Sequence, residues 1–284
     1  RVGGSGFVAS PDSPAGRIDS GSGPMRHIYL SPHLDDAALS CGGTIHHHAT
    51  GGQPVVVITV LSGEPEGGEL SSFARLQHEY WGDPPRPMAL RRAEDIAALT
   101  LLGAEAWHLE YLDAVYRTSP EGGWLYPEEE ALWNSVHPAD PLGQNGAELL
   151  AVQLDQVIPS GDPATIYAPL GVGHHVDHQI IHAAGRRLLE LGHQVAFYED
   201  YPYAEKPSTS DPAVTAASVG QWRVESLALT AMDLTAKTSA LSYYRSQMSI
   251  LFGGSEAMPN RIWTFATSRS PQAGLAERIW WPQG

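Results

Sequence analysis

The chain has 284 residues, 42% of them hydrophobic, which is enough for one large domain or two small ones with a substantial core. Its formal net charge of −15, from 32 acidic and 17 basic residues, argues against a nucleic-acid partner, because phosphate binding needs clustered Lys and Arg. No run of about 18 apolar residues suggests a membrane span, and the single cysteine, Cys41, excludes an internal disulfide and fits a reducing, cytoplasmic compartment.

The first 24 residues differ in composition from the rest of the chain. Residues 1–24 are rich in Gly, Ser and Pro without periodicity, so we expect a flexible leader or an expression remnant, with Met25 as a natural start. We expect residues 25–284 to form a single domain, because neither an internal repeat nor a composition break divides them.

Strand and helix patterns alternate along this domain. Runs of β-formers predict strands over 27–33, 55–62, 106–112, 165–171, 195–204 and 221–229. Apolar periodicity predicts helices starting at 35–36 and over 88–102, 147–158, 177–191 and 232–250. Long loops are expected over 63–87 and 113–147, and the terminal ERIWWP is expected to close a sheet edge. This alternation predicts a three-layer α/β fold with a mostly parallel sheet.

Two clusters of His and Asp follow predicted strands. The first is SPHLDD, with His33, Asp35 and Asp36, and the second is HHVDH, which ends at His178. The carboxyl ends of parallel strands share one rim, so the clusters should meet there although they lie far apart in sequence. Two imidazoles and a carboxylate facing one point make a divalent-metal site with open positions for water.

The spacing within each cluster suggests that some of its residues bind the metal while others contact the water or the reacting group. Across the tight turn, His33 and Asp36 can converge on a metal while Asp35 points at the water on it. His175 and His178 are three residues apart on one helical face, so one can bind the metal while the other reaches the reacting group. Neither a dinucleotide-binding glycine motif after the first strand nor a P-loop occurs, so a nucleotide cofactor has no support.

The ordered pair of motifs resembles the LmbE/PIG-L-like zinc-dependent N-acetylglucosaminyl deacetylases, whose signature is PHxDD after the first strand and HxxDH after a later one. Here these are residues 32–36 and 175–178, and the resemblance covers most of 26–205. Further segments (LRRAEDIAAL, LEYLDAVYR, YEDYPYA, YRSQM) are similar to the branch that includes teicoplanin-type pseudoaglycone deacetylases. The resemblance implies a Rossmann-like three-layer sandwich.

The resemblance also implies roles for individual residues. One Zn²⁺ per chain would be bound by His33, Asp36 and His178, with Asp35 as general base. His175 would stabilise the oxyanion or protonate the leaving amine. Asp177 would orient a ligand histidine, and Arg91 or Arg92 would position the substrate. Independently of the resemblance, we expect aromatic side chains of the long loops to stack on the sugar: Tyr80, Trp81, Tyr116, Trp124 and Trp133. Some members of the family carry a catalytic Tyr where this chain has Gly173, so Tyr201 or Tyr203 would have to supply that group.

The implied reaction is removal of an acetyl or other acyl group from the amide nitrogen of an N-acetylglucosamine-type sugar or its conjugate. Three alternatives stay open: a metal-dependent amidase on a larger amide such as a thiol conjugate, a metal-stabilised carbohydrate-binding protein without turnover, and an Fe²⁺ enzyme. A binding protein would have no need of Asp35 beside the ligand Asp36. The family also makes a homo-oligomer conceivable.

Overall fold

The structure is a computed structural model that describes residues 25–143, 145–158, 163–206 and 222–283. The predicted leader, residues 1–24, lies outside the described residues. The strands are β1 (Arg26–Ser31), β2 (Val55–Thr59), β3 (Glu105–His108), β4 (Ala164–Pro169), β5 (Gln194–Tyr198), β6 (Trp222–Leu229) and β7 (Leu275–Pro282). The helices are α1 (Asp36–Thr50), α2 (Ser72–Tyr80), α3 (Pro87–Leu102), α4 (Gly146–Val157), α5 (Val176–Glu190), α7 (Ala231–Leu241), α8 (Arg245–Phe252) and α9 (Met258–Arg269).

These strands form one seven-stranded sheet in the order β3-β2-β1-β4-β5-β7-β6. The pairs from β3 to β5 are all parallel, and the two pairs that include β7, with β5 and with β6, are antiparallel. β2 is buried along its whole length, as expected for a β-branched strand covered on both faces. The prediction of a mostly parallel α/β sheet is therefore confirmed.

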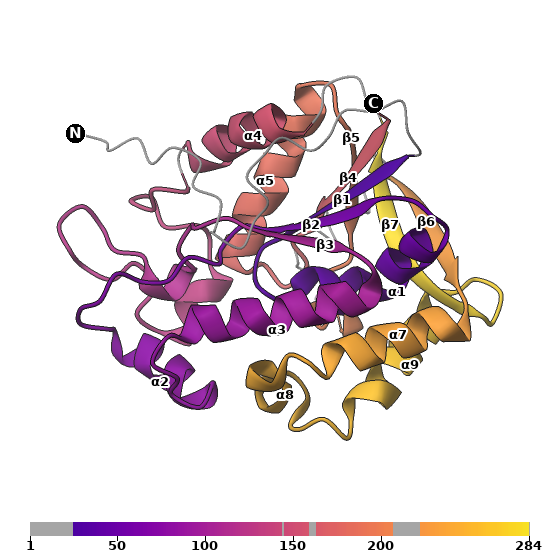
Figure 1. Cartoon of the computed structure of the whole chain (residues 1–284). Coiled ribbons are helices and arrows are strands. Elements are labelled where there is room, and N and C mark those ends of the chain that lie inside the picture. The colour runs from indigo at the N-terminus through magenta and orange to yellow at the C-terminus, as the bar shows by residue number, and fades with distance from the viewer. Residues whose placement is uncertain (1–24, 144, 159–162, 207–221, 284) are drawn as a thin grey trace.

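Helices cover both faces of the sheet and make three layers (Figure 1). α4 and α5 pack together on one face, and α1, α3 and α7 pack on the other. A continuous hydrophobic core fills both interfaces, and a second apolar cluster lies around α2 and the segment after β3. Among the described residues, no helix is long and apolar enough to cross a membrane.

A buried ion pair ties the C-terminal elements to α1. The Nζ atom of Lys237 on α7 lies 2.6 Å from Oε1 of Glu277 on β7, and both side chains are 2% exposed. Glu277 also accepts hydrogen bonds from the backbone N–H of Gly43 and from the N–H and hydroxyl of Thr44. The pair therefore fixes the helix whose N-terminus carries the first His/Asp cluster.

Several predicted elements differ from the observed ones. The expected loop over 63–87 contains helix α2, which Ser71 caps by accepting a hydrogen bond from the N–H of Ala74. The helix expected over 232–250 is two helices, broken before α8 where the Tyr244 hydroxyl bonds to Asp95 on α3, and α9 was not predicted.

Strand boundaries were also partly wrong. The strands expected over 27–33 and 195–204 end earlier, at Ser31 and Tyr198, so the polar residues after them lie in turns. The terminal strand is not an edge strand. β7 pairs with both β5 and β6, and β6 forms the edge, because the chain inserts its last strand between two earlier ones.

Candidate active site

The two His/Asp clusters lie at the point where the strand order reverses. β1 pairs with β2 on one side and with β4 on the other, and the chain leaves β1 and β4 toward opposite faces. The first cluster follows β1 and the second follows β4, so both occupy the crevice at the carboxyl ends of these central strands. This is where open α/β sheets place their ligands.

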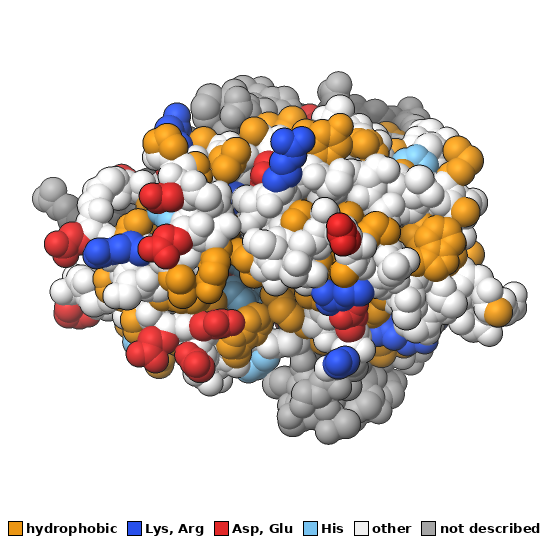
Figure 2. Space-filling model, turned by 90° about the horizontal axis from the view of Figure 1, so that it is seen from below, with side chains coloured by type: hydrophobic (Ala, Val, Ile, Leu, Met, Phe, Trp, Pro, Cys, Tyr) orange, Lys and Arg blue, Asp and Glu red, His pale blue; other side chains and the backbone are white. Residues whose placement is uncertain are grey.

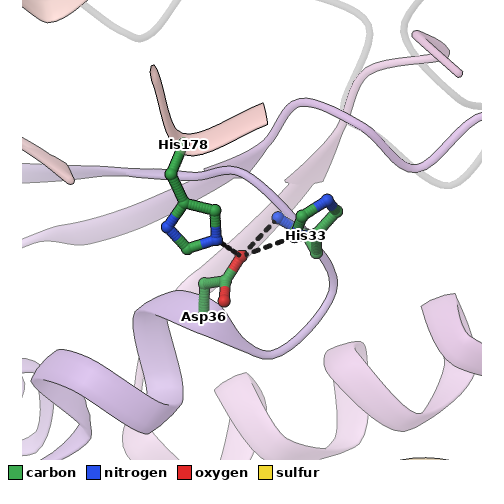
Figure 3. Close-up of side chains that lie close together, drawn as sticks. All are labelled: His33, Asp36 and His178. Atoms are coloured by element: carbon green, nitrogen blue, oxygen red, sulfur yellow. Dashed lines mark hydrogen bonds and ion pairs between the residues drawn. The ribbon is translucent and has the colours of Figure 1, made fainter. Parts of the chain in front are cut away.

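His33, Asp36 and His178 converge on one point, as Figure 3 shows. Oδ2 of Asp36 lies 3.0 Å from Nδ1 of His33 and 3.3 Å from Nε2 of His178. The candidate ligand atoms of all three residues lie within 4.8 Å of one another. His178 is fully buried, and its Nε2 atom has no hydrogen-bond partner in the described structure. An unpartnered, buried imidazole nitrogen facing a carboxylate fits a bound cation.

Each of the two histidines is held by a second carboxylate. Nδ1 of His178 lies 2.6 Å from Oδ1 of Asp200, whose other oxygen accepts hydrogen bonds from the N–H groups of Gly171 and Val172. Nε2 of His33 lies 2.9 Å from Oδ2 of Asp177. Such outer carboxylates fix which nitrogen of a histidine faces a metal. The predicted orienting residue, Asp177, thus lies beside His33 and not beside His178.

Asp177 is itself anchored by a buried arginine. Nη2 of Arg117 lies 2.5 Å from Oδ1 of Asp177, and Nε of the same guanidinium lies 3.0 Å from Asp140. Burial alone would raise the pKa of Asp177, but Arg117 and His33 hold it far below its ordinary value. Asp200 and Arg117 were not predicted. Their positions gave no signal, since Asp200 lies inside the strand expected over 195–204 and Arg117 lies in the loop expected over 113–147.

Asp35 lies beside this cluster under strain. It precedes α1 with a φ of 156°, a backbone conformation that costs a non-glycine residue on the order of 1–3 kcal/mol. Burial and the neighbouring charge of Asp36 raise the pKa of Asp35 to about 7, although Arg91, with Nη2 at 3.9 Å, partly offsets them. A carboxyl group with such a pKa can exchange a proton near neutral pH.

His175 lies on the other side of the cluster, at the N-terminus of α5. Its Nδ1 accepts a hydrogen bond from the N–H of Asp177 at 3.2 Å, so Nε2 carries the proton of the neutral ring. Its ring meets Trp133 edge to face at a centroid distance of 5.1 Å. Burial and the neighbouring His33 hold the pKa of His175 well below its ordinary value.

These groups open into a cavity of about 170 Å³. Figure 2 views the molecule from the side of this cavity and shows histidine surface at the base of a hollow rimmed largely by hydrophobic side chains. The lining includes His33, Asp35, Asp36, His175, Phe73, Trp81, Arg91, Asp113, Glu129, Trp133, Tyr203 and Gln247. The arrangement can hold a metal, a proton acceptor and a hydrogen-bond donor around one small ligand.

Comparison with known proteins places this chain in a family. The model of the family described as "PIG-L: GlcNAc-PI de-N-acetylase" matches residues 28–189, more than half of the chain. The chain belongs to the PIG-L family.

Among curated relatives, the chain is similar to two 2'-N-acetylparomamine deacetylases. It is 29% identical to that of Niallia circulans over 190 residues, covering 62% of this chain and 66% of the relative. It is 32% identical to that of Streptomyces fradiae over 190 residues, covering 66% of this chain and 60% of the relative. The alignments therefore span less than two thirds of the length of either relative, 66% and 60%.

Solved structures match over more of the chain. The zinc-inhibited form of teicoplanin deacetylase Orf2 has a TM-score of 0.75 and 28% identity, covering 90% of this chain and 97% of the other. The A40926 pseudoaglycone deacetylase Dbv21 has a TM-score of 0.70 and 26% identity, with coverages of 91% and 97%. The similarity to these PIG-L structures thus includes the segments after the family match ends.

The predicted substrate contacts divide into two groups. Trp81 and Arg91 line the cavity, and the Arg91 guanidinium lies 4.8 Å from the Trp81 ring centroid. Arg92, Tyr80 and Tyr116 do not line it. Arg92 turns away to donate a hydrogen bond to the backbone oxygen of Ser62.

The two tyrosines lie elsewhere because of helix α2. Tyr80 lies at the exposed end of that helix, with 51% of its surface accessible. Tyr116 is buried under the helix, and its hydroxyl lies 2.7 Å from Nε2 of His78. A segment interpreted as a loop gave no indication of which aromatic would face inward.

The cavity contains a tyrosine, Tyr203, beside Gly173. A Cβ atom on Gly173, where φ is +87°, would lie 2.6 Å from Cγ of Tyr203. The Tyr203 ring therefore occupies the space that a side chain at position 173 would need, and its hydroxyl pKa is raised by burial and by the charges of Asp36 and Asp35. Tyr201 lies off the cavity, with its hydroxyl bonded to Glu205.

Proposed function

We propose that this PIG-L protein is a metal-dependent hydrolase that removes an acetyl group from the amide nitrogen of an N-acetylglucosamine-type sugar or its conjugate. The observation that supports this proposal is the convergence of His33, Asp36 and His178, with an unpartnered His178 nitrogen, beside a second carboxylate on the cavity wall. The curated relatives and similar structures are named as deacetylases of 2'-N-acetylparomamine, of teicoplanin and of the A40926 pseudoaglycone.

We infer that the metal is Zn²⁺, one per chain, with Fe²⁺ as the alternative for the same ligand set. Nδ1 of His33, a carboxylate oxygen of Asp36 and Nε2 of His178 would hold it. When bound, such a cation polarises the amide carbonyl and makes a water nucleophilic near neutral pH. Asp177 and Asp200 each occupy the other ring nitrogen of a histidine, which leaves the two ligand nitrogens facing Asp36.

Two side chains, Asp35 and His175, would act on the proton and on the oxyanion of the reaction. Asp35 accepts the proton of the water that attacks the acetyl carbon, because its carboxyl group lines the cavity directly beside the ligand Asp36. As the new C–O bond forms, Nε2–H of His175 donates a hydrogen bond to the developing oxyanion. One good donor of this kind contributes on the order of 3–4 kcal/mol to such reactions.

Collapse of this adduct breaks the C–N bond, and the sugar nitrogen takes up the proton that Asp35 removed. The products are acetate and a free amine. Tyr203 lines the same cavity, and its hydroxyl would supply a second donor in place of the tyrosine that some family members carry at the position of Gly173. Trp81 and Trp133 provide flat apolar walls on which a pyranose ring can stack.

The test combines metal analysis with acetate release from a panel of N-acetylglucosaminides. Zinc is supplied at one equivalent and in excess, because the related Orf2 is described in a zinc-inhibited form. We expect about one metal per chain and chelator-sensitive acetate release. Metal without acetate from any sugar would favour the amidase of larger amides, and no metal at all would refute the site.

Two variants separate the proposed roles. Asp35→Asn should keep the metal but lose turnover by about 100-fold or more, as expected for removal of a general base. His178→Ala should lose the metal instead. Asp155→Asn is the matched control, because it makes the same Asp-to-Asn change at a residue that contacts a histidine, His193, at 2.7 Å but does not line the cavity. Near-normal kcat in Asp35→Asn would exclude Asp35 as the base.

A further inference from the structure

Helix α8 forms a wall of the cavity although it lies outside the segment that matches the PIG-L family model. It supplies Gln247, Ile250 and Leu251 to the lining and packs beside α2 (Figure 1). Ile250 and Leu251 are apolar, so Gln247 is the polar group that this helix presents to the cavity. Its side chain is only 6% exposed, although it is an uncharged amide with four hydrogen-bonding positions.

Neighbouring bonds determine how the Gln247 amide is oriented. The Ser246 hydroxyl donates its single hydrogen to Oε2 of Glu94 on α3, at 2.6 Å, and the Ser246 N–H donates to Oε1 at 3.1 Å. A hydroxyl whose hydrogen is used can only accept from another neighbour. The 2.9 Å contact between Ser246 and Gln247 therefore involves the amide Nε2–H of Gln247 and not its oxygen.

The hydrogen bonds from Gln247 to Ser246 and from Ser246 to Glu94 use the Gln247 nitrogen and leave its oxygen, Oε1, without a partner. Oε1 of Gln247 has no hydrogen-bond partner among the described residues, and the residue lines the cavity. An unpartnered side-chain oxygen that is not enclosed by protein must face open space, and Gln247 lines the cavity, so a group that enters the cavity can donate a hydrogen bond to Oε1. Gln247 does not hold α8 in place, because its one side-chain bond goes to its neighbour, whereas Glu94 and Ser246 join the two helices.

We propose that Gln247 is a specificity-determining residue whose Oε1 accepts a hydrogen bond from a ring hydroxyl of the substrate. The inference rests on the proposed function and adds a requirement to it. The sugar must carry a free hydroxyl on the side of α8, and a substrate that lacks this hydroxyl is discriminated against. Glu94 and Ser246 act as positioning residues that keep the accepting oxygen toward the cavity.

The experiment compares Gln247→Ala with wild type on N-acetylglucosamine derivatives that have all hydroxyls or lack one at the 3, 4 or 6 position. With the full sugar, kcat/KM should fall about three- to tenfold, mainly through KM, as expected for one neutral hydrogen bond. One deoxy sugar should be a correspondingly poorer substrate for wild type but suffer no additional loss in the variant. Ser249→Ala, an exposed serine on the same helix, should behave as wild type with every sugar.

A second variant tests the orientation of the amide. In Glu94→Gln, the Ser246 hydroxyl is free to donate to Gln247, so the amide can turn its nitrogen toward the cavity. The preference for the hydroxyl that Gln247 recognises should then shrink, while metal content stays at the wild-type level.

The outcomes separate the two proposals. Acetate release that is equal in Gln247→Ala and wild type with all sugars overturns the inference alone, and so does an equal loss with every sugar. No acetate release by wild type from any sugar overturns the proposed function, and this inference with it.

Discussion

Replacing Asp200 by asparagine should weaken metal binding without unfolding the protein. One oxygen of Asp200 accepts hydrogen bonds from the N–H groups of Gly171 and Val172 at 2.8 and 2.9 Å, and the other lies 2.6 Å from Nδ1 of His178. An asparagine can keep the two backbone bonds through its oxygen only if its NH₂ group faces Nδ1 of His178. That nitrogen must then be an acceptor, so the proton moves to Nε2, the nitrogen that faces Asp36.

A protonated Nε2 has no lone pair for a metal, so binding requires the tautomer to change or the amide to flip. A flip leaves two backbone donors facing an NH₂ group, at about 1–3 kcal/mol for each buried unpaired donor. Changes to such outer partners typically weaken metal binding 10- to 100-fold, which corresponds to about 1.4–2.8 kcal/mol.

The assay is a metal titration against a competing chelator, with acetate release followed in parallel. We expect Asp200→Asn to bind metal 10- to 100-fold more weakly and to regain activity when metal is in excess. Asp155→Asn, which alters the partly buried pair with His193 away from the site, should match wild type. Unchanged metal affinity in a folded Asp200→Asn protein would refute the assignment of His178 Nε2 as a ligand.

Three further predictions concern stability and packing. Lys237→Met should destabilise the fold by about 3–5 kcal/mol, because it leaves Glu277 buried without its counter-charge. His27 is buried and stacked on a second histidine, and burial lowers its pKa to about 4. In the unfolded protein His27 takes up a proton at a higher pH than in the folded protein. The free energy of unfolding should therefore fall as pH falls from about 6.5 to 4, by up to about 1.4 kcal/mol per pH unit. His27→Phe should remove this contribution to the pH dependence. Gly173→Ala should displace the Tyr203 ring and lower kcat/KM, because its Cβ would lie 2.6 Å from that ring.

Denaturant unfolding measures the first two effects and steady-state kinetics the third. A loss below about 1 kcal/mol in Lys237→Met would show that Glu277 finds another partner or becomes protonated. Parallel pH–stability curves for wild type and His27→Phe would contradict a lowered pKa at His27. Wild-type kinetics in Gly173→Ala would show that the ring of Tyr203 moves without consequence.

Local patterns determined much of this site. His33 and Asp36 are three residues apart across a turn, and a strand before and a helix after them are enough to bring both side chains to one point. The same holds for the second cluster, where His178 lies in the first turn of α5. The uninterrupted β-branched run of β2 likewise indicates a strand buried on both faces, whatever its neighbours are.

Other features depend on contacts between segments that are distant in sequence. Asp200, Arg117 and Gln247 become part of the site only because β5, the loop after β3 and α8 pack against it. Nothing in their local sequence separates them from ordinary acidic, basic or amide residues on a surface.

The tertiary structure also decided the order of the strands in the sheet and which aromatic side chains face the cavity. Strand β7 lies inside the sheet because its pairing partners come from two different places in the chain, which no local pattern encodes. The short helix α2 turns Trp81 toward the cavity and leaves Tyr80 in solvent. Sequence by itself therefore determined the fold class and where the two motifs meet, since these follow from local periodicity and strand–turn–helix order. Only tertiary packing decided which side chains from distant parts of the sequence contact the two motifs and line the cavity around them.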